Sequence, residues 1–281
     1  MSWLQTDVIA PPAPGPRQVM FASLLKPHWS GSASGLFCFA VLLYERRRLP
    51  RIASVRSLPG DRLMEETGVY EAMSTLRAVR RLRSDPLPDE VLERVLEAAT
   101  WAPTGGNLQP WRAIVLRDSE LKAATGRLYA DCWQRYVGGH RAAIDGLGAE
   151  LKASQERMLA AGDYLAEHWA DSPAIVVFCF NPEAMAITDR ALDRVSVVGG
   201  ASVYPAVENL LLACRAEGLG CVLTTLLCEV EEELRALLGF PGPWGVAAAV
   251  PLGYPLLGGH GSISRRPVNK MFFSDSWGKA W

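Results

Sequence analysis

The stretch APTGGNLQPW at residues 102–111 is the feature that most constrains the fold, because it separates two regular elements. A helical pattern runs into it, and the apolar segment 112–117 that follows has strand character. Pro103 and Pro110 have no backbone N–H to donate, and each keeps the residue before it out of helical backbone. We therefore predict a tight loop between a helix that ends near Pro103 and a strand that begins after Pro110.

The residues inside this loop are suited to binding. Gly105 and Gly106 permit positive φ and a close approach of the backbone to a ligand. Asn107 and Gln109 carry amides that donate and accept hydrogen bonds together. We interpret the loop as a site for the edge of a planar polar molecule, with an ordinary helix-to-strand turn as the alternative.

Composition excludes several classes of protein. The chain has 281 residues, is 49% hydrophobic and 21% charged, and carries a net charge of −1, so nothing in its charge indicates a nucleic-acid partner. Its six cysteines contain no C-x-x-C pair, and its four histidines form no H-E-x-x-H. We predict buried thiols in a reducing compartment, which we take to be the cytoplasm, with no disulfide framework and no metal site.

Residues 1–63 differ from the rest of the chain, because seven prolines interrupt any periodicity. Their apolar run, 36–44, is far shorter than the ~20 residues of a membrane span. The basic group 46–48 follows that run, whereas a signal peptide has its positive charge first. We predict neither a cleavable signal nor a membrane anchor. Our hypothesis is a disordered extension over 1–63, as would arise from a start codon assigned too far upstream, followed by one domain over 64–281.

The remainder predicts a compact α+β domain. The continuous apolar run 174–180 after Pro173 predicts a strand buried on both faces. Gly218 is placed to end the helix expected at about 203–217. We expect helices at 69–76, from Pro88 to Pro103, at 119–128 with Ser119 as the cap, within 130–168, at about 203–217 and at 230–238. We expect strands at 112–117, 174–180, 221–226 and 246–252, and an irregular tail over 258–281.

No motif for protein-based catalysis is present. The Gly218-x-Gly220 pair lacks the third glycine of a dinucleotide fingerprint and precedes a strand rather than a helix. The sequence has no P-loop, no G-x-S-x-G and no set of residues that indicates an activated nucleophile. Binding features remain: arginines within 77–83, the pair Thr224-Thr225, and Arg265-Arg266. Arginines fix phosphates through charge-assisted hydrogen bonds, although a solvated basic turn is the alternative for 77–83.

The order of these features resembles the FMN-dependent nitroreductase family. The resemblance covers about residues 69–270 and rests on the arginine loop, the helix with an acidic start, APTGGNLQPW, and the run from ENLLLA at 208–213 to Gly218-Leu219-Gly220. LLGFP at 237–241 and LGYP at 252–255 resemble that family's closing motifs. The resemblance implies a homodimeric α+β sandwich, with a central, mostly antiparallel sheet flanked by helices and FMN bound at the subunit interface.

The resemblance also implies an activity. NADH or NADPH would reduce the flavin, which would pass electrons to nitroaromatics, quinones or related small acceptors by a ping-pong route. Because the flavin supplies the hydride chemistry, we assign no catalytic residue. Two alternatives stay open: a reductive dehalogenase-like or flavin-destructase-like member of the same fold, and a non-enzymatic flavin-storage protein in which 130–168 shields the flavin.

The resemblance assigns cofactor-binding residues by position. Near the FMN phosphate it places the first loop with Arg77, Ala78, Arg80 and Arg81, together with Arg265 or Arg266. Along the ribityl chain and ring edge it places Thr104, Gly105, Asn107 and Gln109, and beside the ring near N5 it places Thr224 and Thr225. Many members have an arginine and a serine where this chain has Leu76 and Ala78, and Arg81 is a candidate substitute for those phosphate contacts.

Two aromatic features remain. Trp133 and Tyr136 are candidates for stacking on an aromatic acceptor, with core packing as the alternative.

The segment 262–281 has too much apolar surface for a free tail. Since aromatic and methionine side chains are enriched in interface cores, and the resembled family's C-terminal segment reaches across the partner subunit, we predict that this tail stabilises a homodimer. The apolar residues of the tail are Ile263, Met271, Phe272, Phe273, Trp277 and Trp281.

Overall fold

The computed structural model of the chain describes residues 67–281. The hypothesis of a disordered extension over 1–63 lies outside the described residues. Among the helices of 67–281, none combines the length and apolar character needed to cross a bilayer.

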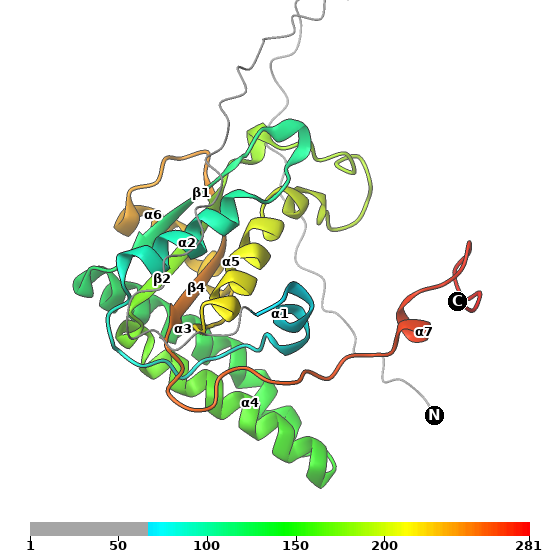
Figure 1. Ribbon diagram of the computed structural model, residues 1–281, viewed down its shortest axis with the longest axis horizontal. Coiled ribbons are helices and arrows are strands. Elements are labelled where there is room, and N and C mark those ends of the chain that lie inside the picture. The colour runs from blue at the N-terminus through cyan, green and yellow to red at the C-terminus, as the bar shows by residue number, and fades with distance from the viewer. Residues whose placement is uncertain (1–66) are drawn as a thin grey trace, which may run out of the picture. The chain divides into compact units, whose positions relative to one another are not determined.

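A four-stranded antiparallel sheet forms the centre of this domain (Figure 1). Its order is β1 (Trp111–Leu116), β2 (Ala174–Phe180), β4 (Gly245–Gly253) and β3 (Gly220–Cys221). Every residue of β4, and every residue of β2 except its last, is buried. The prediction of a mostly antiparallel sheet with 174–180 as a strand buried on both faces is therefore confirmed.

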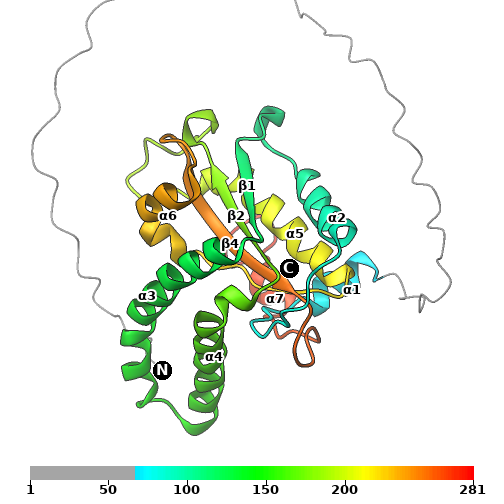
Figure 2. The same ribbon diagram turned by 90° about the vertical axis from the view of Figure 1, so that its left-hand side faces the viewer.

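Helices cover both faces of the sheet. In Figure 2, α2 (Asp89–Thr100) and α5 (Tyr204–Ala216) lie on one side, and α3 (Ser119–Ile144) and α6 (Glu231–Leu238) lie on the other. The remaining helices are α1 (Val69–Thr75), α4 (Ala149–Glu167) and the short α7 (Val268–Met271). Successive side chains of β2 alternate between the two cores: Val176 packs with the first pair of helices, and Val177 packs with the second. The result is the predicted α+β sandwich.

Periodic apolar positions explain the first core. Val95 of α2 and Leu210 of α5 are fully buried, and the two helices make one of the most extensive helix contacts of the domain. Gly218 ends the second helix with a φ of 72°, in the left-handed region that glycine enters without strain. The expectations for both helices are confirmed.

The segment 119–167 forms a helical hairpin that differs from the prediction. The cap is Asp118 rather than Ser119: its Oδ1 accepts hydrogen bonds from the N–H groups of Glu120 at 3.0 Å and Leu121 at 2.9 Å. The first helix then continues without a break to Ile144, well past the predicted end at Leu128. The hairpin extends below the sheet in both views (Figures 1 and 2).

Strand β3 is shorter than the predicted 221–226, because the opposing residue on β4 is a proline. The Val222 N–H donates to the Pro251 carbonyl at 3.4 Å, but Pro251 has no N–H to return the bond. Pairing resumes only at one isolated bridge, where Thr224 and Ala249 exchange hydrogen bonds at 3.0 and 2.8 Å. The ladder is therefore interrupted opposite Pro251.

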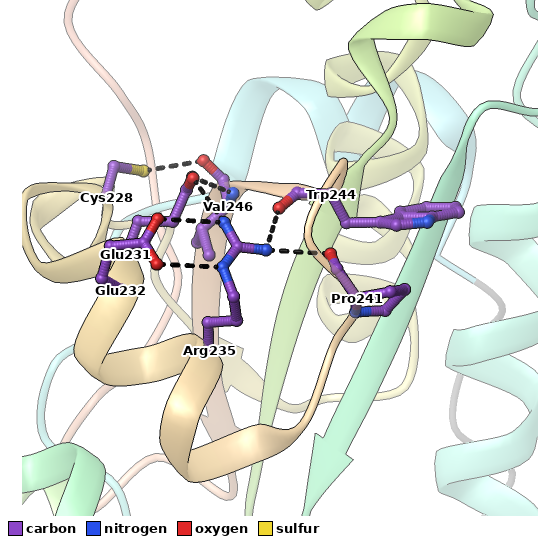
Figure 3. A network of polar contacts seen from close by, with 7 residues as sticks. All are labelled: Cys228, Glu231, Glu232, Arg235, Pro241, Trp244 and Val246. Carbon is purple, nitrogen blue, oxygen red and sulfur yellow. Dashed lines mark hydrogen bonds and ion pairs between the residues drawn. The ribbon is translucent and has the colours of Figure 1, made fainter.

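A polar network ties α6 to the start of β4 (Figure 3). Arg235 donates to the carbonyls of Pro241 at 2.9 Å and Trp244 at 2.7 Å. Glu231 pairs with Arg235 at 3.1 Å and accepts a hydrogen bond from the Val246 N–H at 2.7 Å. These bonds satisfy loop carbonyls that would otherwise lack partners, so the network fixes the turn that contains Gly239 and Pro241.

The described cysteines are free thiols. Four of them are buried, and Cys228 is half-buried. Burial raises the pKa of both Cys179 and Cys228 to about 11. These two thiols stay protonated at neutral pH and are poor nucleophiles. The predicted burial is confirmed for Cys132, Cys179, Cys214 and Cys221, whereas Cys38 lies outside the described residues.

Candidate functional site

The arginine loop at 77–83 is bonded to the sheet edge rather than free in solvent. The Val79 N–H donates to the Cys221 carbonyl at 2.9 Å, and the Arg83 N–H donates to the Tyr254 carbonyl at 2.8 Å. Val79 and Leu82 are buried. The apolar residues of the loop thus anchor it, and its arginines are presented from a fixed backbone.

A glycine on β3 makes this close packing possible. A Cβ added at Gly220 would lie 2.6 Å from Val79 Cγ1 and 2.9 Å from Leu82 Cδ2, well inside van der Waals contact. Only a residue without a side chain lets the arginine loop lie this close to β3. The position of the loop therefore depends on Gly220.

Two adjoining pockets lie against this loop. The first, here called the arginine pocket, has a volume of about 300 Å³. Its lining residues are Met73, Leu76, Arg77, Ala78, Arg80, Glu208, Leu211, Cys221, Val222, Leu223 and Arg265. Three arginines and one glutamate are thus among the residues around a space close to β3.

The second, here called the threonine pocket, has a volume of about 200 Å³. Its lining residues are Arg80, Tyr129, Trp133, Tyr136, Val222, Leu223, Thr224, Thr225 and Leu226. The two pockets share Arg80, Val222 and Leu223, so together they form one groove with a cationic end and an aromatic, hydroxyl-bearing end. We call this combined feature the groove.

A hydrogen-bonded clasp holds the C-terminal segment against the groove. Arg77 Nε donates to the Ser262 carbonyl at 3.0 Å, and Arg77 Nη2 donates to the same oxygen. The Arg77 backbone N–H donates to His260 Nδ1 at 3.3 Å, while His260 Nε2 lies 2.7 Å from the Leu219 carbonyl. This pairing requires a neutral ring with its proton on Nε2. The clasp brings Arg265, which follows in the chain, to the arginine pocket.

The electrostatic surroundings favour that neutral ring. Burial lowers the pKa of His260 below its ordinary value of 6.5, and the nearby charge of Arg215 lowers it further. The contact with the Leu219 carbonyl acts in the opposite direction. Sequence reasoning missed His260, because no local motif marks a histidine whose partners lie 41 and 183 positions away.

Not every predicted arginine lines the groove. Arg77, Arg80 and Arg265 line the arginine pocket, as does Ala78. The Arg81 guanidinium instead lies 4.3 Å from the centre of the Tyr164 ring on α4, in a cation–π contact. Arg81 and the exposed Arg266 line neither pocket.

The loop predicted to hold the ring edge lies at the other end of the sheet. It leads into Trp111, which pairs with Phe180, whereas the groove adjoins Cys221, which pairs with Leu252. The predicted residues Thr104, Gly105, Asn107 and Gln109 line neither pocket of the groove. One chain alone therefore does not bring the two halves of the predicted site together.

This loop has an unusual backbone. Asn107 has a φ of 55° and Gln109 a φ of 47°, in a region that residues with side chains rarely enter. Two hydrogen bonds hold the conformation: Gln109 N–H to Thr104 Oγ1 at 3.0 Å, and Gln109 Nε2 to Asn107 Oδ1 at 3.1 Å. Backbone strain of this kind is concentrated at ligand-binding and active sites.

Tyr129 is a groove residue that the sequence analysis did not single out. Its ring is buried and stacks on Trp169 at a centroid distance of 4.2 Å. Burial raises the pKa of Tyr129, while the nearby Thr224 side chain and the charge of Arg80 act against the rise. The phenol is therefore protonated at neutral pH. The spacing 129, 133, 136 places three aromatic residues on one helical face, and this is the signal that identifies it.

The described residues contain no cluster of side chains suited to binding a metal ion. Within residues 67–281, no group of three or more histidine, cysteine, aspartate or glutamate side chains is arranged to hold a metal ion. The polar side chains of the groove are mainly arginines, hydroxyl groups and one carboxylate, that of Glu208.

Comparisons with known proteins agree with the fold. The sequence profile of the Nitroreductase family matches residues 75–254, more than half of the chain. A Thermus thermophilus protein named NADH dehydrogenase is 29% identical over 216 residues, in an alignment that covers 69% of this chain and 90% of the relative. Iodotyrosine deiodinase 1 of Rattus norvegicus is 26% identical over 195 residues, which are 69% of this chain and 65% of the relative, a little under two thirds. A 5,6-dimethylbenzimidazole synthase of Rhodospirillum rubrum is 30% identical over 188 residues, in an alignment that covers 64% of this chain and 78% of the relative.

Solved structures give the same fold. A BluB-like flavoprotein from Clostridium difficile 630 superposes with a TM-score of 0.55 at 22% identity, covering 74% of this chain and 99% of that one. An iodotyrosine deiodinase bound to FMN and 3-iodo-L-tyrosine superposes with a TM-score of 0.54 at 23% identity, covering 72% and 96%. The sandwich therefore falls in the nitroreductase-like class of α+β folds. With the profile match, the chain belongs to the nitroreductase family.

Proposed function

We propose that this protein is an FMN-dependent NAD(P)H oxidoreductase that reduces nitroaromatic, quinone or related small acceptors by a ping-pong route. The observation that supports it most is the groove, with Arg77, Arg80 and Arg265 at one end and Thr224 and Thr225 at the other. The name of the Thermus thermophilus relative, NADH dehydrogenase, agrees with a nicotinamide donor.

The cationic end of the groove fits a phosphate. Guanidinium groups bind phosphate oxygens through charge-assisted and often bidentate hydrogen bonds. The arginine pocket gathers three of them, with Glu208 as the one opposing carboxylate. The chain has no glycine fingerprint for a second nucleotide half. This set of donors favours a single phosphate, and therefore FMN over FAD.

The other end fits a flat conjugated ring. Tyr129, Val222 and Leu226 supply an apolar and aromatic lining, and Thr224 and Thr225 supply hydroxyls beside it. Bound flavin would supply the hydride chemistry. The protein would orient the ring, exclude water from one of its faces, and stabilise negative charge on the ring with hydroxyl and guanidinium donors.

We further propose that the complete site belongs to a homodimer. The strained, exposed loop at 104–109 would then contact the ring edge from a second copy of the chain, since it lies apart from the groove of its own subunit. The C-terminal tail supports this arrangement. Trp277 is 92% exposed and Trp281 is 77% exposed, surface that a partner subunit would bury. The α7 helix lies away from the sheet (Figure 1).

Two other functions within this fold have specific support. The relatives named iodotyrosine deiodinase and dimethylbenzimidazole synthase favour a dehalogenase-like or flavin-destructase-like reaction. The α3–α4 hairpin, which contributes three aromatic residues to the groove, favours a flavin-storage role in which it covers the ring.

The free thiols of the described chain support a reducing compartment, and we propose the cytoplasm.

Purification followed by turnover tests the proposal. We expect a yellow protein that releases FMN, and no FAD, on heating. It should oxidise NADH or NADPH when a quinone is added. A yellow protein with no turnover would support storage instead, whereas a protein that binds no flavin would contradict both.

A further inference from the structure

Trp133 of α3 lies in the wall of the threonine pocket and contacts α4. The residue is 6% exposed, and its ring lies 5.9 Å from that of Tyr136, which is 47% exposed. Both line the pocket beside Thr224. A rigid indole thus adjoins a more accessible phenol at the aromatic end of the groove.

A glycine on the second helix of the hairpin makes space for this indole. A Cβ added at Gly162 would overlap Cη2 and Cζ2 of Trp133. By contrast, an added Cβ at Gly138 or Gly139 of α3 would meet nothing within 4 Å. Glycine weakens a helix interior by about 0.5–1 kcal/mol relative to alanine. In the middle of α4 this cost is offset by the space that Gly162 leaves for the Trp133 ring. We call this feature the Gly162 notch.

The next residue of α4 fixes the rotation of the ring. Trp133 Nε1 donates to Asp163 Oδ1 at 2.8 Å, and Arg141 pairs with the same carboxylate oxygen. Burial would raise the pKa of Asp163, but the hydrogen bonds from Arg141 and Trp133 hold it below its ordinary value. The carboxylate is therefore charged at neutral pH and remains an acceptor for the indole N–H.

We propose that α4 sets the acceptor specificity of the groove, with Gly162 and Asp163 as positioning residues that hold the Trp133 indole as a flat wall for a planar aromatic acceptor. This inference rests on the proposed function. A fixed aromatic face favours an offset-stacked or edge-to-face ring. Tyr136 and Leu223, both exposed, would contact the outer part of the acceptor. Among the acceptors proposed above, the wall would therefore favour molecules with a flat ring over small inorganic or aliphatic ones.

A double-mutant cycle on the full-length, flavin-loaded protein tests this inference. The variants are Gly162→Ala, Trp133→Leu, their combination, Asp163→Leu and Asp163→Asn, with Gly138→Ala as the matched control. For each variant, kcat and KM are measured with menadione, a planar two-ring quinone, and with ferricyanide, which has no ring to stack. FMN content per subunit is measured on the same samples.

We expect the menadione-to-ferricyanide ratio of kcat/KM to fall roughly tenfold in Gly162→Ala and in Trp133→Leu, mainly through the KM for menadione. The double variant should fall no further, because the notch has no function without the indole. Asp163→Asn, which keeps an acceptor for the indole N–H, should preserve more of the ratio than Asp163→Leu. The control should retain the wild-type ratio.

Three outcomes would overturn the inference. An unchanged ratio in Trp133→Leu would show that the indole does not contact the acceptor. Multiplicative losses in the double variant would show that Gly162 acts through something other than Trp133. If Gly162→Ala does not fold, Trp133→Leu and the two Asp163 variants still decide. A menadione-to-ferricyanide ratio equal to that of the wild type in all three variants would contradict the proposal. Absence of FMN from the wild-type protein would remove the proposed function as well, whereas flavin turnover with unchanged ratios removes this inference alone.

Discussion

Arg77 and His260 join the first loop of the domain to its C-terminal segment: the Arg77 N–H donates to His260 Nδ1 at 3.3 Å, across 183 positions of sequence. The same arginine donates its guanidinium to the Ser262 carbonyl. One residue thus lines the cationic end of the groove and holds the segment that delivers Arg265 to it. Cofactor binding and the position of the tail should consequently be coupled.

This clasp predicts a pH dependence of stability. The pKa of His260 is lowered in the folded protein, so the unfolded chain binds the proton more readily. The stability that the neutral ring contributes is complete above the unfolded pKa near 6.5 and is lost as the pH falls through that value toward the lower folded pKa. In urea unfolding, the wild type should lose more stability between pH 7.5 and pH 5.5 than His260→Asn. Equal losses would contradict the assignment, since His140 and His168 are present in both proteins.

A second prediction separates two neighbouring arginines. Arg77→Ala would remove the charge-assisted phosphate contact that we propose, and it should weaken FMN binding by about 1.5–3 kcal/mol, or roughly ten- to a hundredfold. Arg81→Ala is the matched control, because Arg81 stacks on Tyr164 outside the groove and its loss should leave FMN affinity close to the wild-type value. Flavin fluorescence titration measures both. A larger loss in Arg81→Ala than in Arg77→Ala would reverse the assignment.

A third prediction concerns the fit of the arginine loop against the sheet. Gly220→Ala would force a methyl group against Val79 and Leu82 and should destabilise the fold by about 1–3 kcal/mol. Gly138→Ala, on an open helix surface, should be neutral or stabilising by up to about 1 kcal/mol. Equilibrium unfolding in urea compares the two. Equal stabilities would show that the loop does not depend on its contact with β3.

The fourth prediction concerns the tail. Deleting the residues after Val268 keeps Arg265 and Arg266 but removes most of the apolar side chains of the segment. We expect dimer stability and FMN content to fall together, as measured by sedimentation and flavin absorbance on one sample. A stable dimer with full flavin would make the tail peripheral, and a flavin-bound monomer would contradict the shared site.

The fifth prediction concerns the start of the chain. Residues 1–63 lack periodicity, and every residue that lines the groove lies after residue 72. A protein that begins at Met64 should fold, dimerise and bind FMN as the full chain does. Loss of the dimer or of flavin on this truncation would show that the segment contributes to the domain.

Sequence patterns predicted correctly the helices and strands whose positions depend on residues close together in the chain. The apolar run of β2 and the glycine end of α5 need no information from elsewhere in the chain, and both were predicted correctly. The early end of β3 was not, because it depends on Pro251, which lies on another strand. The cap of α3 was misplaced by one residue, since Asp118 and Ser119 are both good caps and only the helix geometry distinguishes them.

In the candidate site, too, residue chemistry could be predicted from the sequence, whereas contacts between distant segments could not. The arginines and threonines were candidate binding residues because of their chemistry, but their separation from the loop at 104–109 is a property of sheet register. His260 and the Gly162 notch act through contacts between distant segments. A single sequence contains no local pattern for such contacts, and they became evident only from the packing.

The most direct test of the shared site is flavin content in mixed dimers. One subunit would carry Arg77→Ala with Arg80→Ala, and a differently tagged subunit would carry Asn107→Ala with Gln109→Ala. If the groove of one chain and the loop of the other form each site, each homodimer has two damaged sites, while the mixed dimer has one intact site and one doubly damaged site. We predict that purified mixed dimers bind about half the wild-type amount of FMN, while both variant homodimers bind little. Mixed dimers that bind no more flavin than the homodimers would contradict the shared site.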